Sequence, residues 1–178
     1  PYFIYVGAIH QRKNIERMLD AYDMFRNKQS EPHRFVLVGN KKWWTAPMQN
    51  ALDRMKHRDE VIFTGRVSDE ELNDLMGSAF ANVYVSTFEG FGIPIIEAFQ
   101  SEVPVITANV TSMPEIAGNG ALVVDPLSSN QIAEAMLKLS SSAELRNNLV
   151  EKGVARAAEF TWNRTADLLW QSILKASK

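Results

Sequence analysis

The sequence contains no cysteine and only three histidines among its 178 residues. The lack of cysteine excludes a disulfide framework and any metal site built on thiolates. The histidines are scattered, and no Asp-x-Asp pair is present, so we expect no bound metal ion. No apolar run approaches the ~20 residues that a membrane-spanning helix requires.

A strong excess of one charge is also missing. The chain has 19 Lys and Arg residues against 21 Asp and Glu residues, which gives a formal net charge of −2. This balance provides no general reason to expect binding to nucleic acid. The hydrophobic fraction of 46% is ordinary for a globular protein, and the length suffices for one domain with a proper core. A cytoplasmic location is consistent with the lack of cysteine.

Short apolar runs alternate with amphipathic segments along the whole chain. The runs predict six strands, at residues 3–7, 35–39, 61–65, 82–86, 103–107 and 121–124. Between them, apolar residues recur every three to four positions, which predicts helices. Strands that alternate with helices form parallel sheets covered on both faces. We therefore predict an α/β fold over residues 1–178, a Rossmann-like doubly wound six-stranded parallel sheet in the order 3-2-1-4-5-6.

Several polar residues are predicted to begin helices. Asn14 precedes an amphipathic stretch and is a candidate N-cap. Pairs with capping-box spacing occur at Ser68 with Glu71, Ser112 with Glu115, Ser128 with Gln131 and Ser141 with Glu144. Trp162 and Trp170 lie in the last predicted helix, and we expect them to anchor it against this domain or against a missing half of the protein.

Residues 86–97, which read STFEGFGIPIIE, follow the fourth predicted strand. Pro94 is suited to a first helical turn, so the stretch reads as a strand, a turn and a helix N-terminus. We call residues 89–93 the glycine turn, because Gly90 and Gly92 let its backbone approach a ligand closely. Free N–H groups and the positive end of the helix dipole make such a turn a candidate anion site.

Two carboxylates, Glu89 and Glu97, bracket this turn. Carboxylates repel phosphate but accept hydrogen bonds from hydroxyls, so the combination suits a sugar nucleotide. In the predicted strand order, the loop after strand one opens at the same sheet edge as the glycine turn. This first loop, residues 8–14, carries Arg12 and Lys13. We expect the two cations, the turn and the two carboxylates to converge there.

Residues 89–97 resemble the E-x7-E signature of retaining glycosyltransferases with two Rossmann-like halves, the GT-B architecture. The likeness is to the large family 4, also called group 1, and it covers nearly the whole chain. It continues in the stretches YVG at residues 5–7, RKN at 12–14, FTGRVSDEEL at 63–72, PVITAN at 104–109, PEIAG at 114–118 and DP at 125–126. The ordered set is far more specific than the two glutamates alone.

The resemblance implies that residues 1–178 form the donor-binding domain, excised from a longer chain whose N-terminal acceptor domain is missing. Lys13 fits the lysine that neutralises the donor diphosphate in this family. Many members carry an arginine directly after the glycine that corresponds to Gly7, but Ala8 stands at that place here. Arg12 is the candidate substitute.

Further roles follow from the same resemblance. The candidates for catalysis are Lys13, Arg12 and Glu89, with Glu89 facing the transferred sugar. Glu97 would bind the ribose hydroxyls. The remaining donor-binding candidates are Gly7 at the end of strand one, Arg66 and Val67 near the base, and Gly90, Phe91, Gly92 and Ile93 at the phosphates. Strand-end geometry is the alternative reading for Gly7.

The implied reaction moves a hexose, with mannose favoured, from a nucleoside-diphosphate sugar to a glycan or lipid-linked acceptor. GDP-mannose or a UDP-sugar would be the donor, no other cofactor is implied, and the isolated fragment is expected to be inactive. The setting would be polysaccharide or O-antigen assembly in the cytoplasm, with membrane contact at its inner face left open for the missing half. A sugar-nucleotide epimerase and a non-catalytic nucleotide-binding module remain alternatives.

Overall fold

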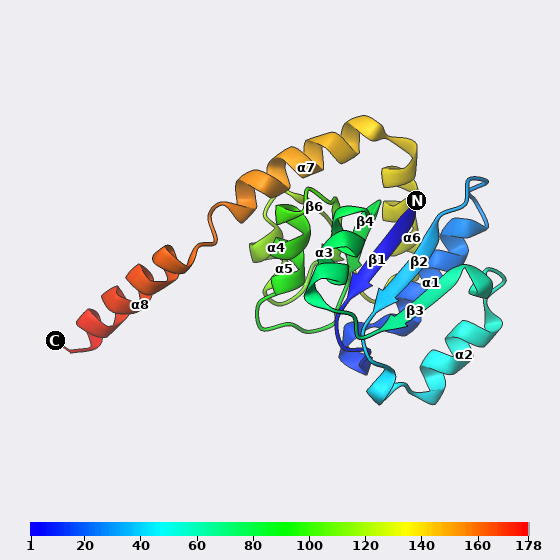
Figure 1. The fold of residues 1–178 in the computed structure, drawn as a ribbon, viewed down its shortest axis with the longest axis horizontal. Coiled ribbons are helices and arrows are strands. Elements are labelled where there is room, and N and C mark those ends of the chain that lie inside the picture. Colours follow the sequence, from blue (N-terminus) through cyan, green and yellow to red (C-terminus); the bar gives the residue numbers. More distant parts are fainter. Residues whose placement is uncertain (178) are drawn as a thin grey trace.

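The computed structural model describes residues 1–177, and its centre is one six-stranded sheet in the order β3-β2-β1-β4-β5-β6 (Figure 1). Every neighbouring pair of strands is parallel. The strands are β1 (Tyr2–Val6), β2 (Arg34–Val38), β3 (Val61–Gly65), β4 (Ala81–Tyr84), β5 (Val105–Ala108) and β6 (Ala121–Val124). The predicted fold class and strand order are confirmed.

Helices cover both faces of this sheet (Figure 1). They are α1 (Ile15–Arg26), α2 (Ala46–Arg54), α3 (Asp69–Gly77), α4 (Ile93–Gln100), α5 (Met113–Ala117), α6 (Ser129–Ser141), α7 (Ala143–Ala157) and α8 (Trp162–Ala176). Helix α1 packs against α2 and α6, and α4 packs against α5 and α7. The central strands are consequently buried, whereas the edge strands β3 and β6 are partly exposed.

The predicted helix starts are only partly confirmed. The capping box of Ser68 and Glu71 is present with both of its hydrogen bonds. Ser128 accepts the Gln131 N–H, but the Gln131 side chain turns to the Asp125 N–H, so that box is half formed. Helix α6 extends through Ser141, and Ser142 accepts the Leu145 N–H at the start of α7 in its place.

Two further cap predictions are wrong. Asn14 adopts a left-handed conformation and its side chain makes no capping bond. Ser112 stands at the start of α5 but does not cap it, and Glu115 takes no part in a capping box. In both cases the polar side chain bonds to a distant loop instead, because tertiary partners satisfy it better than its own helix.

Helix α8 extends away from the rest of the chain (Figure 1). None of its residues is buried, and Trp162 and Trp170 are 88% and 61% exposed. The expectation that they anchor the helix against this domain is therefore wrong, since the connection after α7 carries α8 clear of the sheet. No helix within residues 1–177 is long and apolar enough to cross a bilayer.

Candidate functional site

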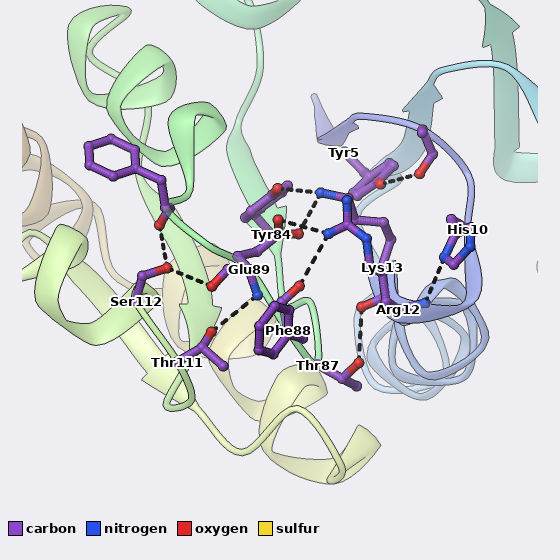
Figure 2. A network of polar contacts seen from close by, with 12 residues as sticks. Tyr5, His10, Arg12, Lys13, Tyr84, Thr87, Phe88, Glu89, Thr111 and Ser112 are labelled. Carbon is purple, nitrogen blue, oxygen red and sulfur yellow. Dashed lines mark hydrogen bonds and ion pairs between the residues drawn. The ribbon is translucent and has the colours of Figure 1, made fainter.

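The first loop and the glycine turn lie side by side at the carboxyl edge of the sheet. Strands β1 and β4 are hydrogen-bonded neighbours, so the loops that follow them leave the sheet next to each other. Thr87 joins them directly, because its backbone N–H and its hydroxyl both donate to the Arg12 carbonyl, at 2.8 Å and 3.1 Å (Figure 2). The predicted convergence of these two segments is confirmed.

Arg12, Lys13 and Glu89 form an ion cluster between the two loops (Figure 2). Lys13 Nζ lies 2.5 Å from Glu89 Oε1, and Arg12 Nη1 lies 2.9 Å from Glu89 Oε2. Arg12 also donates to the Phe88 carbonyl at 3.2 Å. The Lys13 and Glu89 side chains are each only 9% exposed, whereas that of Arg12 is 47% exposed. Arg12 is therefore the cation that solvent and ligands reach most easily.

Tyr84 completes the surroundings of Lys13. Its buried hydroxyl accepts a hydrogen bond from Lys13 Nζ at 2.6 Å, and its ring stacks on that of Tyr5 with 6.2 Å between centroids. Sequence reasoning missed Tyr84, because a tyrosine in an apolar strand reads as part of the core. Its position at the last residue of β4 was the available signal, since site residues gather where strands end.

Burial and pairing set the charges in the cluster. Burial alone would raise the pKa of Glu89, but the hydrogen bonds it accepts, chiefly from Lys13, outweigh burial and the pKa is lowered. Burial lowers the pKa of Lys13, and its pairing with Glu89 only partly offsets that effect. Because Glu89 is ionised at neutral pH, the two cations and one carboxylate leave a net positive charge at this edge.

Asn14 holds the end of the first loop in place. It is buried, with a φ of 63°, a left-handed conformation that asparagine tolerates better than most residues. Its Nδ2 donates to the carbonyls of Val85 and Pro126, at 3.0 Å and 2.7 Å. One side chain thus links the loops after β1, β4 and β6. These contacts also fix the backbone next to Lys13.

The glycine turn presents unpaired backbone donors. Gly92 precedes α4 with a φ of 118°, a conformation that favours glycine. Among residues 1–177, no acceptor receives a hydrogen bond from the N–H of Gly90, Phe91, Gly92 or Ile93. The start of α4 therefore offers consecutive N–H groups and the positive end of a helix dipole close to Arg12.

The loop between β5 and α5, residues 109–112, supports the glycine turn from the other side (Figure 2). Thr111 Oγ1 accepts the Glu89 N–H at 3.2 Å. The Ser112 hydroxyl lies 3.0 Å from the Glu89 carbonyl oxygen and 2.6 Å from that of Phe91. Sequence reasoning assigned Ser112 to a helix cap and did not consider Thr111.

The other predicted donor-binding residues lie apart from the ion cluster. Glu97 is in α4 and stays accessible to solvent, although partial desolvation by neighbouring atoms raises its pKa. Arg66 and Val67 follow β3, so β2 and β1 separate them from the glycine turn along the same edge. Gly7 is packed against the end of β2, where a Cβ on Gly39 would lie 1.9 Å from the Gly7 carbonyl oxygen.

Within residues 1–177, no group of three or more His, Cys, Asp or Glu side chains is placed to hold a metal ion. The arrangement offers instead cations and unpaired amides at one edge, with the exposed carboxylate of Glu97 in α4. It can hold an anion against a positive edge while a carboxylate accepts from hydroxyls.

Comparison with known proteins identifies a family that this chain resembles. The family model for glycosyl transferases group 1 matches residues 1–156. O-antigen chain mannosyltransferase B from Escherichia coli is 34% identical over 161 residues, which are 90% of this chain and 42% of that protein. The chain thus spans less than half of the length of this curated relative.

Solved structures share the fold. A sucrose-phosphate synthase from Thermosynechococcus elongatus superposes with a TM-score of 0.83 at 23% identity, over 99% of this chain and 46% of that one. The C-terminal domain of a glycosyl transferase group 1 family protein (LpcC) from Francisella tularensis gives 0.77 at 23% identity, over 89% of this chain and 85% of that domain. The sheet, its helices and these coverages are those of one Rossmann-like half of the GT-B fold. The chain belongs to the glycosyl transferases group 1 family.

Proposed function

We propose that this chain is the donor-binding half of a retaining glycosyltransferase of family 4. It would transfer a hexose, with mannose favoured, from a nucleoside-diphosphate sugar to a glycan or lipid-linked acceptor. The observation that carries the proposal is the set of unpaired N–H groups from Gly90 to Ile93 beside Arg12 and Lys13. This arrangement suits a diphosphate, whose oxygens need many donors and whose charge needs cations.

The ion cluster indicates how a diphosphate would be received. Glu89 pairs with both cations and so keeps them at the carboxyl edge without close repulsion between them. A diphosphate brings more negative charge than one carboxylate, so it competes with Glu89 for Arg12 and Lys13. Glu89 would then be released towards the sugar that the diphosphate carries.

Charge stabilisation would be the main contribution of this half to the reaction. The bond between the sugar and the diphosphate breaks, and negative charge grows on the leaving oxygen. A fixed donor aimed at such charge is typically worth ~3–4 kcal/mol when it is removed. The acceptor oxygen bonds to the same face of the sugar carbon, and its proton passes to the leaving oxygen. Glu89 and Glu97 would act as binding groups and not as the acid and nucleophile of a glycosidase.

The remaining residues would hold the rest of the donor. Glu97 is accessible, as a ligand for ribose hydroxyls must be. Arg66 and Val67 lie two strands away along the same edge, where the base of an extended nucleotide could reach them. Gly7 would act by leaving room for the Tyr5 side chain after β1, since a Cβ on Gly7 would lie 2.9 Å from the Tyr5 hydroxyl oxygen.

The choice of mannose is supported by relatives. Several proteins similar to this chain are named mannosyltransferases, including O-antigen and serotype-specific ones. GDP-mannose is therefore our favoured donor and a UDP-sugar the second. Assembly of a bacterial polysaccharide in the cytoplasm, at the inner face of the membrane, is the corresponding setting. Contact with that membrane and with the acceptor would come from an N-terminal acceptor domain outside these residues.

Titration calorimetry on this chain with GDP, UDP and ADP tests the proposal. We expect saturable binding of at least one of them, with GDP the tightest, and loss of binding in Lys13→Ala. Lys42→Ala is the matched control, since Lys42 is an exposed lysine near the same edge that lies over Trp43 and outside the ion cluster. No heat of binding from any of the three at millimolar concentration would remove the basis of the proposal.

A further inference from the structure

We propose that Thr111 and Ser112 are positioning residues that aim the N–H groups of the glycine turn at the donor phosphates. This inference rests on the proposed function. Neither residue would touch the donor, and both would act through the backbone of residues 89–91.

The turn has almost no backbone bonding of its own. Between Thr87 N–H, which donates to Arg12, and Ile95 N–H, which donates to Gly92, no backbone–backbone hydrogen bond involves residues 88–91 in the described chain. Within residues 1–177, and apart from the Arg12 contact to the Phe88 carbonyl, the hydrogen bonds that hold this backbone come from Thr111 and Ser112. Two side-chain hydroxyls thus satisfy backbone groups that backbone–backbone hydrogen bonds would satisfy in a helix or strand.

Peptide planarity makes this support directional. The Glu89 carbonyl and the Gly90 N–H belong to one peptide plane, and the Phe91 carbonyl and the Gly92 N–H to another. In a trans peptide the two groups point in opposite directions. The Ser112 hydroxyl lies against both carbonyl oxygens, so it turns the Gly90 and Gly92 N–H groups away from α5 and towards the open side of the turn.

Thr111 is held in an unfavourable conformation to make its contact. Its φ is 56°, and a β-branched residue rarely adopts this left-handed region. Such strain persists where the surrounding structure fixes it, and it gathers at functional sites. Glu102 has nearly the same φ, 58°, in the loop between α4 and β5, although its side chain is not β-branched. That loop lies at the opposite edge of the sheet, so Glu102 is a matched control.

The first test is Ser112→Ala, with GDP affinity from calorimetry and melting temperature measured together. Loss of the hydroxyl should weaken GDP binding about tenfold, the equivalent of one hydrogen bond. Ser112→Thr keeps a hydroxyl and should restore most of the affinity. Ser142→Ala removes a cap hydroxyl far from this edge and should lower the melting temperature without changing the affinity.

Thr111→Gly separates positioning from stability. It removes the contact to Glu89 and relieves the backbone strain, so affinity should fall while the melting temperature stays close to that of the unsubstituted chain. Glu102→Gly relieves a left-handed conformation elsewhere and should leave affinity unchanged. If Ser112→Ala does not fold, Thr111→Gly still tests the positioning role.

The outcomes distinguish the two proposals. If the unsubstituted chain binds GDP and both Ser112→Ala and Thr111→Gly bind it equally well, the positioning role is overturned and the proposed function stands. If affinity and melting temperature fall in proportion in both variants and in Ser142→Ala alike, the role is merely structural and is likewise overturned. If the unsubstituted chain binds no nucleoside diphosphate, both proposals fall together.

Discussion

Two ion clusters, at opposite edges of the sheet, each combine a buried cation, a glutamate and a tyrosine hydroxyl. At the carboxyl edge, Lys13 and Glu89 meet the hydroxyl of Tyr84. At the amino edge, Arg26 and Glu60 meet the hydroxyl of Tyr22, with Arg26 Nε 2.6 Å from Glu60 Oε2 and the hydroxyl 2.9 Å from the same oxygen. Each cluster ties elements that are far apart in sequence.

The two clusters differ in what they leave unsatisfied. Arg26 makes four hydrogen bonds, two to Glu60 and two to the carbonyls of Gln29 and Glu31, and its single positive charge is matched by one carboxylate. The cluster around Glu89 carries an extra cation, Arg12, and adjoins N–H groups without acceptors. Within residues 1–177, the amino-edge cluster thus has its charge matched, whereas the carboxyl-edge cluster keeps an extra cation beside unpaired N–H groups, the two features on which the proposed anion site rests.

Arg26→Met should produce the largest effect on stability. It leaves the Glu60 carboxylate, which is about a third exposed, without its main partner, so we expect a loss of about 2–3 kcal/mol of unfolding free energy. In a chain of this size that loss corresponds to a fall of roughly 5–10 °C in melting temperature. GDP affinity of the folded fraction should not change.

Arg54→Met is the control for that measurement. Arg54 pairs with Asp20, but its side chain is 56% exposed, and exposed pairs contribute about 0–1 kcal/mol. A fall in melting temperature as large as that of Arg26→Met would show that the amino-edge cluster contributes no more to stability than an exposed ion pair.

Lys13→Met should have the largest effect on binding. It removes a buried cation from the edge where the diphosphate is proposed to lie, and we expect GDP affinity to fall about 100-fold. Arg12 still pairs with Glu89, so the melting temperature should fall less than in Arg26→Met. Calorimetry on Lys13→Met, with Lys42→Met as control, measures this difference; equal affinities in the two variants would contradict the comparison.

Acidification should produce the smallest effect and should touch both clusters. The pKa values of Glu89 and Glu60 are both lowered in the folded chain, against about 4.3 for an unfolded glutamate. Each carboxylate therefore contributes stability above about pH 5 that is lost as the pH falls through its folded pKa. Glu89→Gln should lower stability by about 1–2 kcal/mol at pH 7 and by less at pH 4. Denaturant unfolding at both pH values measures the difference in unfolding free energy between the unsubstituted chain and Glu89→Gln. A difference that is larger at pH 4 than at pH 7 would contradict the prediction.

The fold was predictable because its signals are local. Runs of apolar residues at strand length, separated by amphipathic helices, fix a parallel sheet, and connection rules reduce the strand order to the one observed. The neighbouring positions of the first loop and the glycine turn follow from that order alone. Helix starts were less predictable, because Asn14 and Ser112 have the right type and spacing for caps yet bond to loops more than 70 and 20 residues away.

The placement of the candidate cations and of Glu89 at one edge was predictable, but the bonds between them were not. Arg12, Lys13 and Glu89 were named from topology and resemblance, yet nothing in the sequence shows that Glu89 pairs with both cations. Tyr84 and Thr111 were missed because a core tyrosine and a loop threonine carry no distinctive pattern. Their contribution depends on side-chain direction and on one backbone angle, which only coordinates supply.

Backbone NMR of this chain during titration with GDP shows whether the glycine turn receives the diphosphate. We expect the amide signals of Gly90, Phe91, Gly92 and Ile93 to shift together and to saturate with the same dissociation constant as the calorimetric signal. Amides around the amino-edge cluster, such as that of Glu60, should stay unchanged. Saturable binding that moves signals elsewhere and leaves the glycine turn unaffected would contradict it.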